Sequence, residues 1–338
     1  MRRAKPLLVV LAGEALFTSF FDAPRRRRLA GLYRWRRAGA RSLTPPVRTL
    51  IARADALLTT WDSPGFDASL PRIAPRLRLI AHCGGEVKRR FARPLFDRLT
   101  ITNAAAPMAP YVAELAVTLL LHAARNVEAY REAMRRPASD VYARVHERGA
   151  GDETVRGRTV GLVGFGRIGQ AIAQLLRPFG ARLLVHDPYA SPAAVRRHGA
   201  TRAPLRRVLA ASPFLILAAA LTDETRGLLD ARALARLPDG ATVINVARGG
   251  LVDLDALTRE VSRGRLRCAL DVTDPLEPLP PRHPLRRLPG AVVTPHVGSA
   301  QAEVRRQMAD VLLDDLERFA RGRPVRHRVR ASMLERMT

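Results

Sequence analysis

The chain has 338 residues, of which 47% are hydrophobic. Because this length exceeds the usual size of a domain with one compact core, we expect two domains. Its two cysteines, Cys83 and Cys268, form no CxxC or Cys/His cluster, which argues against a disulfide framework and a metal site. The formal net charge is +26, yet the arginines that carry it are scattered through every segment, and only 5% of residues are aromatic. A nucleic-acid-binding face concentrates basic and aromatic residues in one place. We therefore attribute the charge to biased composition and expect no nucleic-acid partner.

The N-terminus resembles a signal peptide, because basic residues precede the apolar stretch Pro6–Ala12. Glu14 interrupts that stretch early, and Asp22 and the run Arg25–Arg28 soon follow, so we expect a buried strand at Leu7–Leu11 instead. We interpret Arg25–Arg28 as a solvated helix face. The other apolar runs are shorter than the roughly 20 residues of a membrane span or carry charges. The sequence therefore predicts a cytoplasmic protein with no membrane partner.

Short apolar strands alternate with helix-like stretches over residues 1–102, and loops containing Gly, Pro or Asp follow them. The strands expected there are Leu7–Leu11, Ala56–Thr59, Leu77–Ala81 and Leu99–Thr102. An amphipathic helix near 301–321 ends the ordered part. We expect the basic tail after Pro324 to be mobile.

A second α/β series follows an apolar helix at about 110–126 and an arginine-rich stretch at 131–158. Its expected strands are Thr159–Val163, Arg182–His186, Phe214–Ala218, Thr242–Val246, Cys268–Val272 and Ala291–Thr294. Helical stretches separate these strands, which predicts a parallel sheet with right-handed crossovers.

A glycine-rich turn at 164–169 follows the first strand of this series and opens a helix, which is the context that makes a GxGxxG motif specific. Gly164 permits a tight turn, Gly166 lets a pyrophosphate approach the backbone, and Gly169 lets helix and strand pack closely. The helix N-terminus supplies free N–H groups and a positive dipole for the phosphates. The motif therefore predicts a dinucleotide site.

Asp187 ends the second strand, 18 residues beyond the last glycine of the turn. A carboxylate there accepts hydrogen bonds from the ribose hydroxyls and repels a 2′-phosphate, which favours NAD over NADP. Arg167 can add a charge-assisted contact to the phosphates, and we place Ile168 and Val246 beside the cofactor as well.

Three types of polar residue follow later strands of the series, where ligands of an open parallel sheet bind. Arg248 follows one strand, Asp271 lies within the next, with Asp274 and Glu277 after it, and His296 follows the last. Arginine can hold a carboxylate bidentately, histidine can exchange a proton near neutral pH, and a carboxylate can orient the histidine. Each residue alone is ordinary loop chemistry; together they suit hydride transfer to a 2-oxo acid.

These residues resemble the D-isomer-specific 2-hydroxyacid dehydrogenases, in the family's order, from about Val112 to Ser299. The stretches that carry the resemblance are Gly161–Gly169, Asn245–Asp253, Ala269–Val272 and Thr294–His296, with shorter echoes at Thr222–Leu228 and Val112–Leu115. The resemblance implies two Rossmann-like doubly wound domains. An NAD-binding domain, 103–298, is inserted into a flavodoxin-like substrate domain of 1–102 plus 299–338. It also implies a homodimer joined through the cofactor domains.

The resemblance assigns roles to several residues. Arg248 would bind the carboxylate and carbonyl of a 2-oxo or 2-hydroxy acid, and His296 would donate and accept the proton with Glu277 as its partner. Asp271 would contact the nicotinamide carboxamide. The backbone N–H groups of Gly84 and Gly85 would meet the substrate carboxylate.

Several positions depart from the family pattern. The acid usually comes one residue earlier than Glu277; its Glu-Pro pairing favours Glu277, and Asp274 is the alternative. Ala220, preceded by Ala219, replaces a usual proline at the cofactor. Lys88 stands where an acid is common, so no particular substrate can be carried over.

Two functions remain open. The first is an NAD(H)-dependent dehydrogenase of D-2-hydroxy acids, with side-chain specificity expected around Trp61–Asp62 and Lys88. The second is an NAD(H)-sensing regulator with little turnover, similar to corepressors of the same fold, which the altered Gly84–Lys88 loop would suit.

Overall fold

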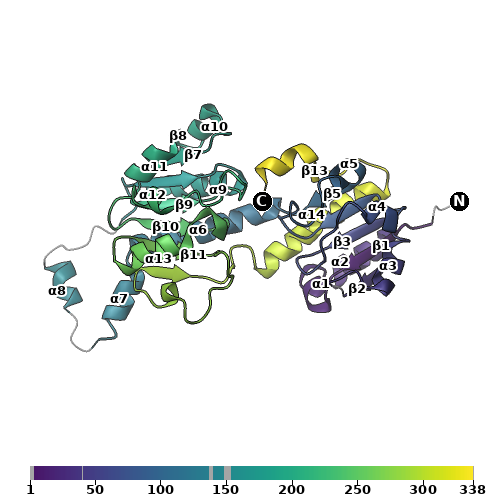
Figure 1. Cartoon of the computed structure of the whole chain (residues 1–338), viewed down its shortest axis with the longest axis horizontal. Coiled ribbons are helices and arrows are strands. Elements are labelled where there is room, and N and C mark those ends of the chain that lie inside the picture. Colours follow the sequence, from purple (N-terminus) through teal and green to yellow (C-terminus); the bar gives the residue numbers. More distant parts are fainter. Residues whose placement is uncertain (1–3, 40, 137–139, 148–153, 338) are drawn as a thin grey trace. The chain divides into compact units, whose positions relative to one another are not determined.

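A computed structural model describes residues 4–39, 41–136, 140–147 and 154–337, and the chain divides into two compact units. The first unit comprises residues 1–108 and 299–338, and the second comprises residues 109–298. The boundary thus follows residue 108, whereas the sequence analysis placed it after residue 102. The second unit is inserted in the first, and each is described separately below (Figure 1).

A six-stranded sheet forms the centre of the first unit, in the order β13-β5-β4-β3-β1-β2. Its strands are β1 (Leu7–Leu11), β2 (Arg34–Ala38), β3 (Ala56–Thr59), β4 (Leu79–His82), β5 (Thr100–Asn103) and β13 (Arg328–Val329). Strands β1 to β5 are parallel in the flavodoxin-like order 2-1-3-4-5, and β13 is antiparallel to β5. The inner strands β3 and β4 are buried at every residue, as expected of a parallel sheet covered on both faces.

Helices surround this sheet. They are α1 (Glu14–Phe20), α2 (Ala23–Leu32), α3 (Pro45–Ile51), α4 (Leu70–Ile73), α5 (Leu95–Arg98) and α14 (Ala302–Ala320), with short 3₁₀ turns at Ala106–Met108 and Ala331–Arg336. The long helix α14 lies against α1 and α2, so the end of the chain completes the N-terminal unit.

A seven-stranded parallel sheet forms the second unit, in the order β12-β11-β10-β9-β6-β7-β8. Its strands are β6 (Thr159–Val163), β7 (Arg182–His186), β8 (Ala200–Arg202), β9 (Phe214–Leu217), β10 (Thr242–Asn245), β11 (Arg267–Leu270) and β12 (Ala291–Val293). The order reverses between β6 and β9, which is the point where a doubly wound sheet binds its ligand. The doubly wound α/β fold is confirmed.

The helices of the second unit are α6 (Ala109–Ala124), α7 (Val127–Ala133), α8 (Val141–His146), α9 (Arg167–Leu176), α10 (Pro192–Arg197), α11 (Leu205–Ala211), α12 (Ala231–Leu234) and α13 (Leu254–Ser262). Short 3₁₀ turns lie at Arg177–Phe179, Gly249–Leu251 and Pro284–Arg286. The stretch Ala106–Ala124, which contains α6, is long and apolar enough to cross a membrane. One such helix is weak evidence for a membrane, because the core helix of a soluble protein passes the same test. Helix α6 packs against α9 with Ala113, Ala116 and Leu120 fully buried.

Three strands were missed by the sequence analysis, β2, β8 and β13, and all three lie at sheet edges. β2 has the sequence Arg-Trp-Arg-Arg-Ala with no fully buried residue, and β8 is three residues long with two exposed. An edge strand needs no apolar face, so hydrophobic alternation does not reveal it.

The prediction of a mobile tail after Pro324 is wrong. β13 pairs with β5, and the loop before it is tied to Asp315 of α14, whose side chain is fully buried. The Asp315 carboxylate accepts hydrogen bonds from the backbone N–H groups of Arg326 at 2.7 Å and His327 at 3.2 Å, and it pairs with His327 Nδ1 at 3.0 Å. A buried carboxylate that is satisfied in this way fixes the tail on the sheet.

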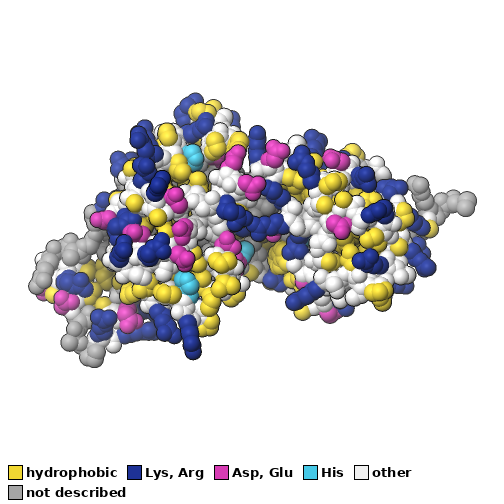
Figure 2. Space-filling view, in the orientation of Figure 1, with side chains coloured by type: hydrophobic (Ala, Val, Ile, Leu, Met, Phe, Trp, Pro, Cys, Tyr) yellow, Lys and Arg dark blue, Asp and Glu magenta, His cyan; other side chains and the backbone are white. Residues whose placement is uncertain are grey.

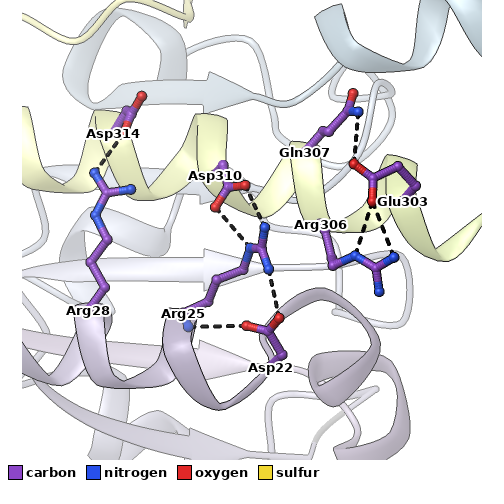
Figure 3. Close-up of polar contacts among 8 residues, drawn as sticks. All are labelled: Asp22, Arg25, Arg28, Glu303, Arg306, Gln307, Asp310 and Asp314. Carbon is purple, nitrogen blue, oxygen red and sulfur yellow. Dashed lines mark hydrogen bonds and ion pairs between the residues drawn. The ribbon is translucent and has the colours of Figure 1, made fainter.

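Basic side chains are spread over the visible face of each unit, with acidic side chains among them (Figure 2). The run Arg25–Arg28, interpreted from the sequence as a solvated helix face, is solvated only in part: Arg27 is exposed, whereas Arg25 and Arg28 form ion pairs. Arg25 of α2 binds Asp310 of α14 through two bonds of 2.8 and 2.6 Å, and Arg28 binds Asp314 and Glu317 at 2.6 and 2.7 Å. Figure 3 shows these arginines pointing from α2 toward α14.

Replacing Asp315 with Ala should lower the free energy of unfolding of the first unit by about 3 kcal/mol, because it strips two backbone donors and a histidine of a buried partner. Asp314→Ala, on the same helix but half-exposed, is the matched control and should cost less than about 1 kcal/mol. Urea denaturation monitored by circular dichroism measures both. Equal losses in the two variants would contradict the assigned role of Asp315.

Candidate active site

The glycine-rich turn connects β6 to α9. Its first and last glycines pack closely against backbone atoms, whereas its middle glycine does not. Gly164 has φ +93°, and a Cβ on it would lie 2.5 Å from the backbone nitrogen of Ala219. A Cβ on Gly169 would overlap the carbonyl oxygen of Gly164. A Cβ on Gly166, in contrast, would have no atom within 4 Å. The first and last glycines are thus required by packing, and the middle one borders open space.

Asp187 follows β7 and holds the glycine-rich turn. Its Oδ2 accepts a hydrogen bond of 2.7 Å from the backbone N–H of Phe165, and its Oδ1 accepts from the N–H groups of Tyr189 and Ala190 at 2.8 and 3.1 Å. The Tyr189 hydroxyl in turn donates to Glu224 at 3.1 Å. The carboxylate expected at a ribose therefore lies beside the turn and is oriented by three backbone donors.

Asn245, which the sequence analysis did not single out, shapes the loop that carries Arg248. The side chain is buried at the end of β10; its Nδ2 donates to the Arg248 carbonyl at 2.9 Å, and its Oδ1 accepts from Ala247 N–H at 3.1 Å. A Cβ on Gly249 would overlap the backbone of Thr273, so the loops after β10 and β11 are packed in direct contact. The one sequence signal for Asn245 is that it is a polar residue at the end of an otherwise apolar strand.

Asp271 follows β11 and is 2% exposed. Its carboxylate accepts hydrogen bonds from Thr294 Oγ1 at 2.6 Å and from the N–H groups of Val297 and Gly298 at 2.8 and 3.0 Å. Its carbonyl accepts from His296 N–H at 2.9 Å, and His296 has φ +55°. Asp271 therefore fixes the loop that bears His296; its expected contact with a carboxamide stays a prediction.

His296 and Glu277 are brought together. His296 Nδ1 is hydrogen-bonded to Glu277 Oε1, and the two side chains are 47% and 34% exposed. The alternative acid, Asp274, instead pairs with Arg226 at 3.7 Å. Because Glu277 engages Nδ1, Nε2 is the ring nitrogen that can exchange a proton with a substrate.

Glu277 is held as a carboxylate. Its partial burial favours the protonated form, but the hydrogen bond and charge of His296, a backbone hydrogen bond from Thr273 and the charge of Arg248 outweigh it, so its pKa is lowered. Arg248 donates from Nη1 to the carbonyl of Ala247 at 2.7 Å. The three residues proposed from the sequence thus form one electrostatically coupled group in the second unit.

The loop with Gly84 and Gly85 follows β4 in the first unit. Gly84 N–H donates to the carbonyl of His82 at 2.9 Å, so it is already engaged, unlike the expectation for this residue. Gly85 N–H has no acceptor among the described residues, while its carbonyl accepts from Asn103 Nδ2 at 3.1 Å. Of the two glycines, Gly85 is therefore the one whose backbone N–H can donate a hydrogen bond to a ligand.

Cys83 and Cys268 are buried free thiols, and burial raises the pKa of each. In the part of the chain that the structure describes, no three His, Cys, Asp or Glu residues are grouped to hold a metal ion. Both cysteines are core residues and poor nucleophiles.

Comparison with known proteins decides the family. The family model described as "D-isomer specific 2-hydroxyacid dehydrogenase, NAD binding domain" matches residues 117–298. The chain belongs to this family. It is 37% identical over 266 residues to D-3-phosphoglycerate dehydrogenase of Mycobacterium tuberculosis (strain ATCC 25618 / H37Rv), covering 75% of this chain and 47% of that protein. The chain thus spans about half the length of the curated relatives it matches first.

Other similar proteins align over more of their own length. The chain is 33% identical over 287 residues to glyoxylate reductase of Korarchaeum cryptofilum (strain OPF8), covering 82% of this chain and 84% of that protein. The crystal structure of TT0316 protein from Thermus thermophilus superposes with a TM-score of 0.75 at 32% identity, covering 96% of this chain and 99% of that one. Apo D-mandelate dehydrogenase of Rhodotorula graminis has a TM-score of 0.83 at 21% identity, covering 96% of this chain and 98% of that one, and supports the fold.

The residues of the turn fit the NAD(H) of this family. Gly166 borders open space at the N-terminus of α9, where backbone N–H groups and the helix dipole favour a pyrophosphate. Asp187 stands at the end of β7, where it can meet ribose hydroxyls. The cofactor is therefore NAD(H), held by this chain's second unit.

Replacing Gly166 with Val should lower NADH affinity at least tenfold while leaving thermal unfolding nearly unchanged, because the new side chain enters only the space left for phosphates. Gly169→Ala should destabilise the second unit itself, because its Cβ overlaps backbone. NADH fluorescence titration and differential scanning fluorimetry separate the two effects. Unchanged NADH affinity in Gly166→Val would overturn this assignment.

Proposed function

We propose that the chain is an NAD(H)-dependent oxidoreductase that interconverts a 2-oxo acid and a D-2-hydroxy acid. The observation that carries the proposal is the His296–Glu277 pair, coupled to Arg248 at the strand ends of an NAD-binding domain. Reduction of a 2-oxo acid needs a group that binds the substrate carboxylate and a group that delivers a proton. The arginine can do the first, and the hydrogen-bonded histidine–carboxylate pair can do the second.

Each residue has one role in this reaction. The Arg248 guanidinium binds the substrate carboxylate and polarises the adjacent carbonyl. Bound NADH supplies the hydride. His296 Nε2 gives its proton to the developing alkoxide, and Glu277 stabilises the imidazolium through Nδ1. In the oxidation of a hydroxy acid, His296 takes the proton instead.

Further assignments belong to the same proposal. Gly85 N–H meets the substrate carboxylate, and Asp271 and Val246 lie at the nicotinamide end of the cofactor. Asp187 sets the preference for NAD over NADP. The curated relatives named glyoxylate reductase and D-3-phosphoglycerate dehydrogenase act on small acids, as their names say, which supports a small 2-oxo or 2-hydroxy acid here. We also propose a cytoplasmic homodimer.

Replacing His296 with Gln should lower kcat at least about 100-fold with a 2-oxo acid, because the proton donor is removed. NADH affinity should change less than twofold. His122→Gln, on α6, is the control and should retain activity. NADH absorbance with a panel of 2-oxo acids measures turnover. NADH binding without turnover of any member by the native protein would favour the sensor function instead.

Replacing Glu277 with Gln tests its lowered pKa. A carboxyl whose pKa is depressed by folding adds stability above its unfolded pKa and loses it as the pH falls through the folded pKa. The melting temperature of the native protein should therefore exceed that of Glu277→Gln from pH 7 to 5, and the difference should shrink progressively as the pH falls below about 4. Asp274→Asn is the control for loss of a carboxyl from the same loop. A Glu277 effect that does not shrink on acidification would contradict the ion pair.

A further inference from the structure

Arg305, in the first turns of α14, is a half-buried cation without a carboxylate partner among the residues that the structure describes. Its guanidinium carbon lies 5.3 Å from the ring centre of Trp61 and 5.7 Å from that of Phe20. Nη1 donates to Ser19 Oγ at 2.8 Å, whereas Nε is buried and meets no hydrogen-bond acceptor in the described ranges. The next residue, Arg306, pairs with Glu303. The Arg305 guanidinium is thus held by two aromatic rings and one hydroxyl, and not by a carboxylate among the described residues.

Trp61 connects this arginine to the loop that offers Gly85 N–H. The indole follows β3, and a Cβ on Gly84 would lie 3.0 Å from its Nε1. One face of the ring thus carries the Arg305 guanidinium, and one edge borders the glycine loop. Both lie at the carboxyl ends of β3 and β4, where a parallel sheet binds ligands.

The groups around Trp61 do not form an ion pair with Arg305 among the described residues. The Asp62 carboxylate accepts hydrogen bonds from Gly13 N–H at 2.8 Å and from the Thr60 hydroxyl. His82 is fully buried with Nδ1 bonded to Thr59 Oγ1, and burial, aided by the charge of Arg90, lowers its pKa to about 3. His82 is therefore uncharged, and the Arg305 guanidinium remains available to an anion.

We propose that Arg305, stacked on Trp61 and Phe20, binds a second anionic group at the far end of the substrate. The substrate is then a 2-oxo acid that carries a distal carboxylate or phosphate. This inference rests on the proposed function, because it takes the substrate's first carboxylate to lie at Gly85 N–H. The aromatic faces orient the planar guanidinium, whose fixed fork of N–H groups matches a carboxylate or a phosphate.

Three probes test the proposal in the native protein with NADH. They are 2-oxoglutarate, with a distal carboxylate, phosphohydroxypyruvate, with a distal phosphate, and 2-oxohexanoate, whose side chain is uncharged. We expect kcat/KM to be at least tenfold higher for one of the two distal anions, and the preferred one identifies carboxylate or phosphate. Arg305→Gln should abolish that preference, and Arg305→Lys should retain part of it. The matched control Arg306→Gln should leave it unchanged. Preference of the native protein for 2-oxohexanoate would overturn the proposal without any variant.

Calorimetric titration of the NAD-bound protein separates this inference from the proposed function. Loss of distal-anion binding in Arg305→Gln, with 2-oxohexanoate binding retained, supports the anion site even without turnover. Turnover of 2-oxohexanoate with no preference for either distal anion leaves the dehydrogenase function intact and refutes the anion site. An equal loss for all three probes in Arg305→Gln refutes it as well, since that pattern indicates a purely structural role.

Discussion

The candidate active site depends on one buried carboxylate. Asp271 receives three hydrogen bonds from the segment after β12 and, through its carbonyl, a fourth from His296. These bonds hold His296 in the left-handed backbone region, where a non-glycine residue needs support from its surroundings. Without them the imidazole would have no fixed position relative to Glu277. Asp271, which directly follows β11, thereby fixes the loop that carries the histidine of the acid–base pair.

The same principle organises the rest of the second unit. Asn245 orders the Arg248 loop, and Asp187 ties the glycine-rich turn to the loop after β7. Each is a polar side chain at a strand end that accepts or donates bonds to the next loop. Arg248 and His296 can therefore remain partly exposed while Asn245 and Asp271, which position their loops, are buried.

Much of this architecture could be predicted from the sequence, because buried parallel strands are continuous apolar runs and the glycine-rich turn has strict packing needs. The edge strand β2 could not, since its side chains need no apolar pattern. The docked tail depends on Asp315 binding residues that follow it by 11 and 12 positions, which no local pattern reports. Glu277 was preferred over Asp274 from its Glu-Pro pairing, yet only coordinates show which acid meets His296. That Arg305 has no carboxylate partner within the described part of the chain is likewise visible only from three-dimensional contacts.

We propose that bound NADH transfers its hydride to one face of a 2-oxo acid and that His296 supplies the proton. The most direct measurement is the product formed from a 2-oxo acid and NADH deuterated at both C4 positions, analysed by mass spectrometry and chiral chromatography. We expect a single D-2-hydroxy acid with deuterium at C2. A racemic or L product, or a product without deuterium at C2, would contradict the account.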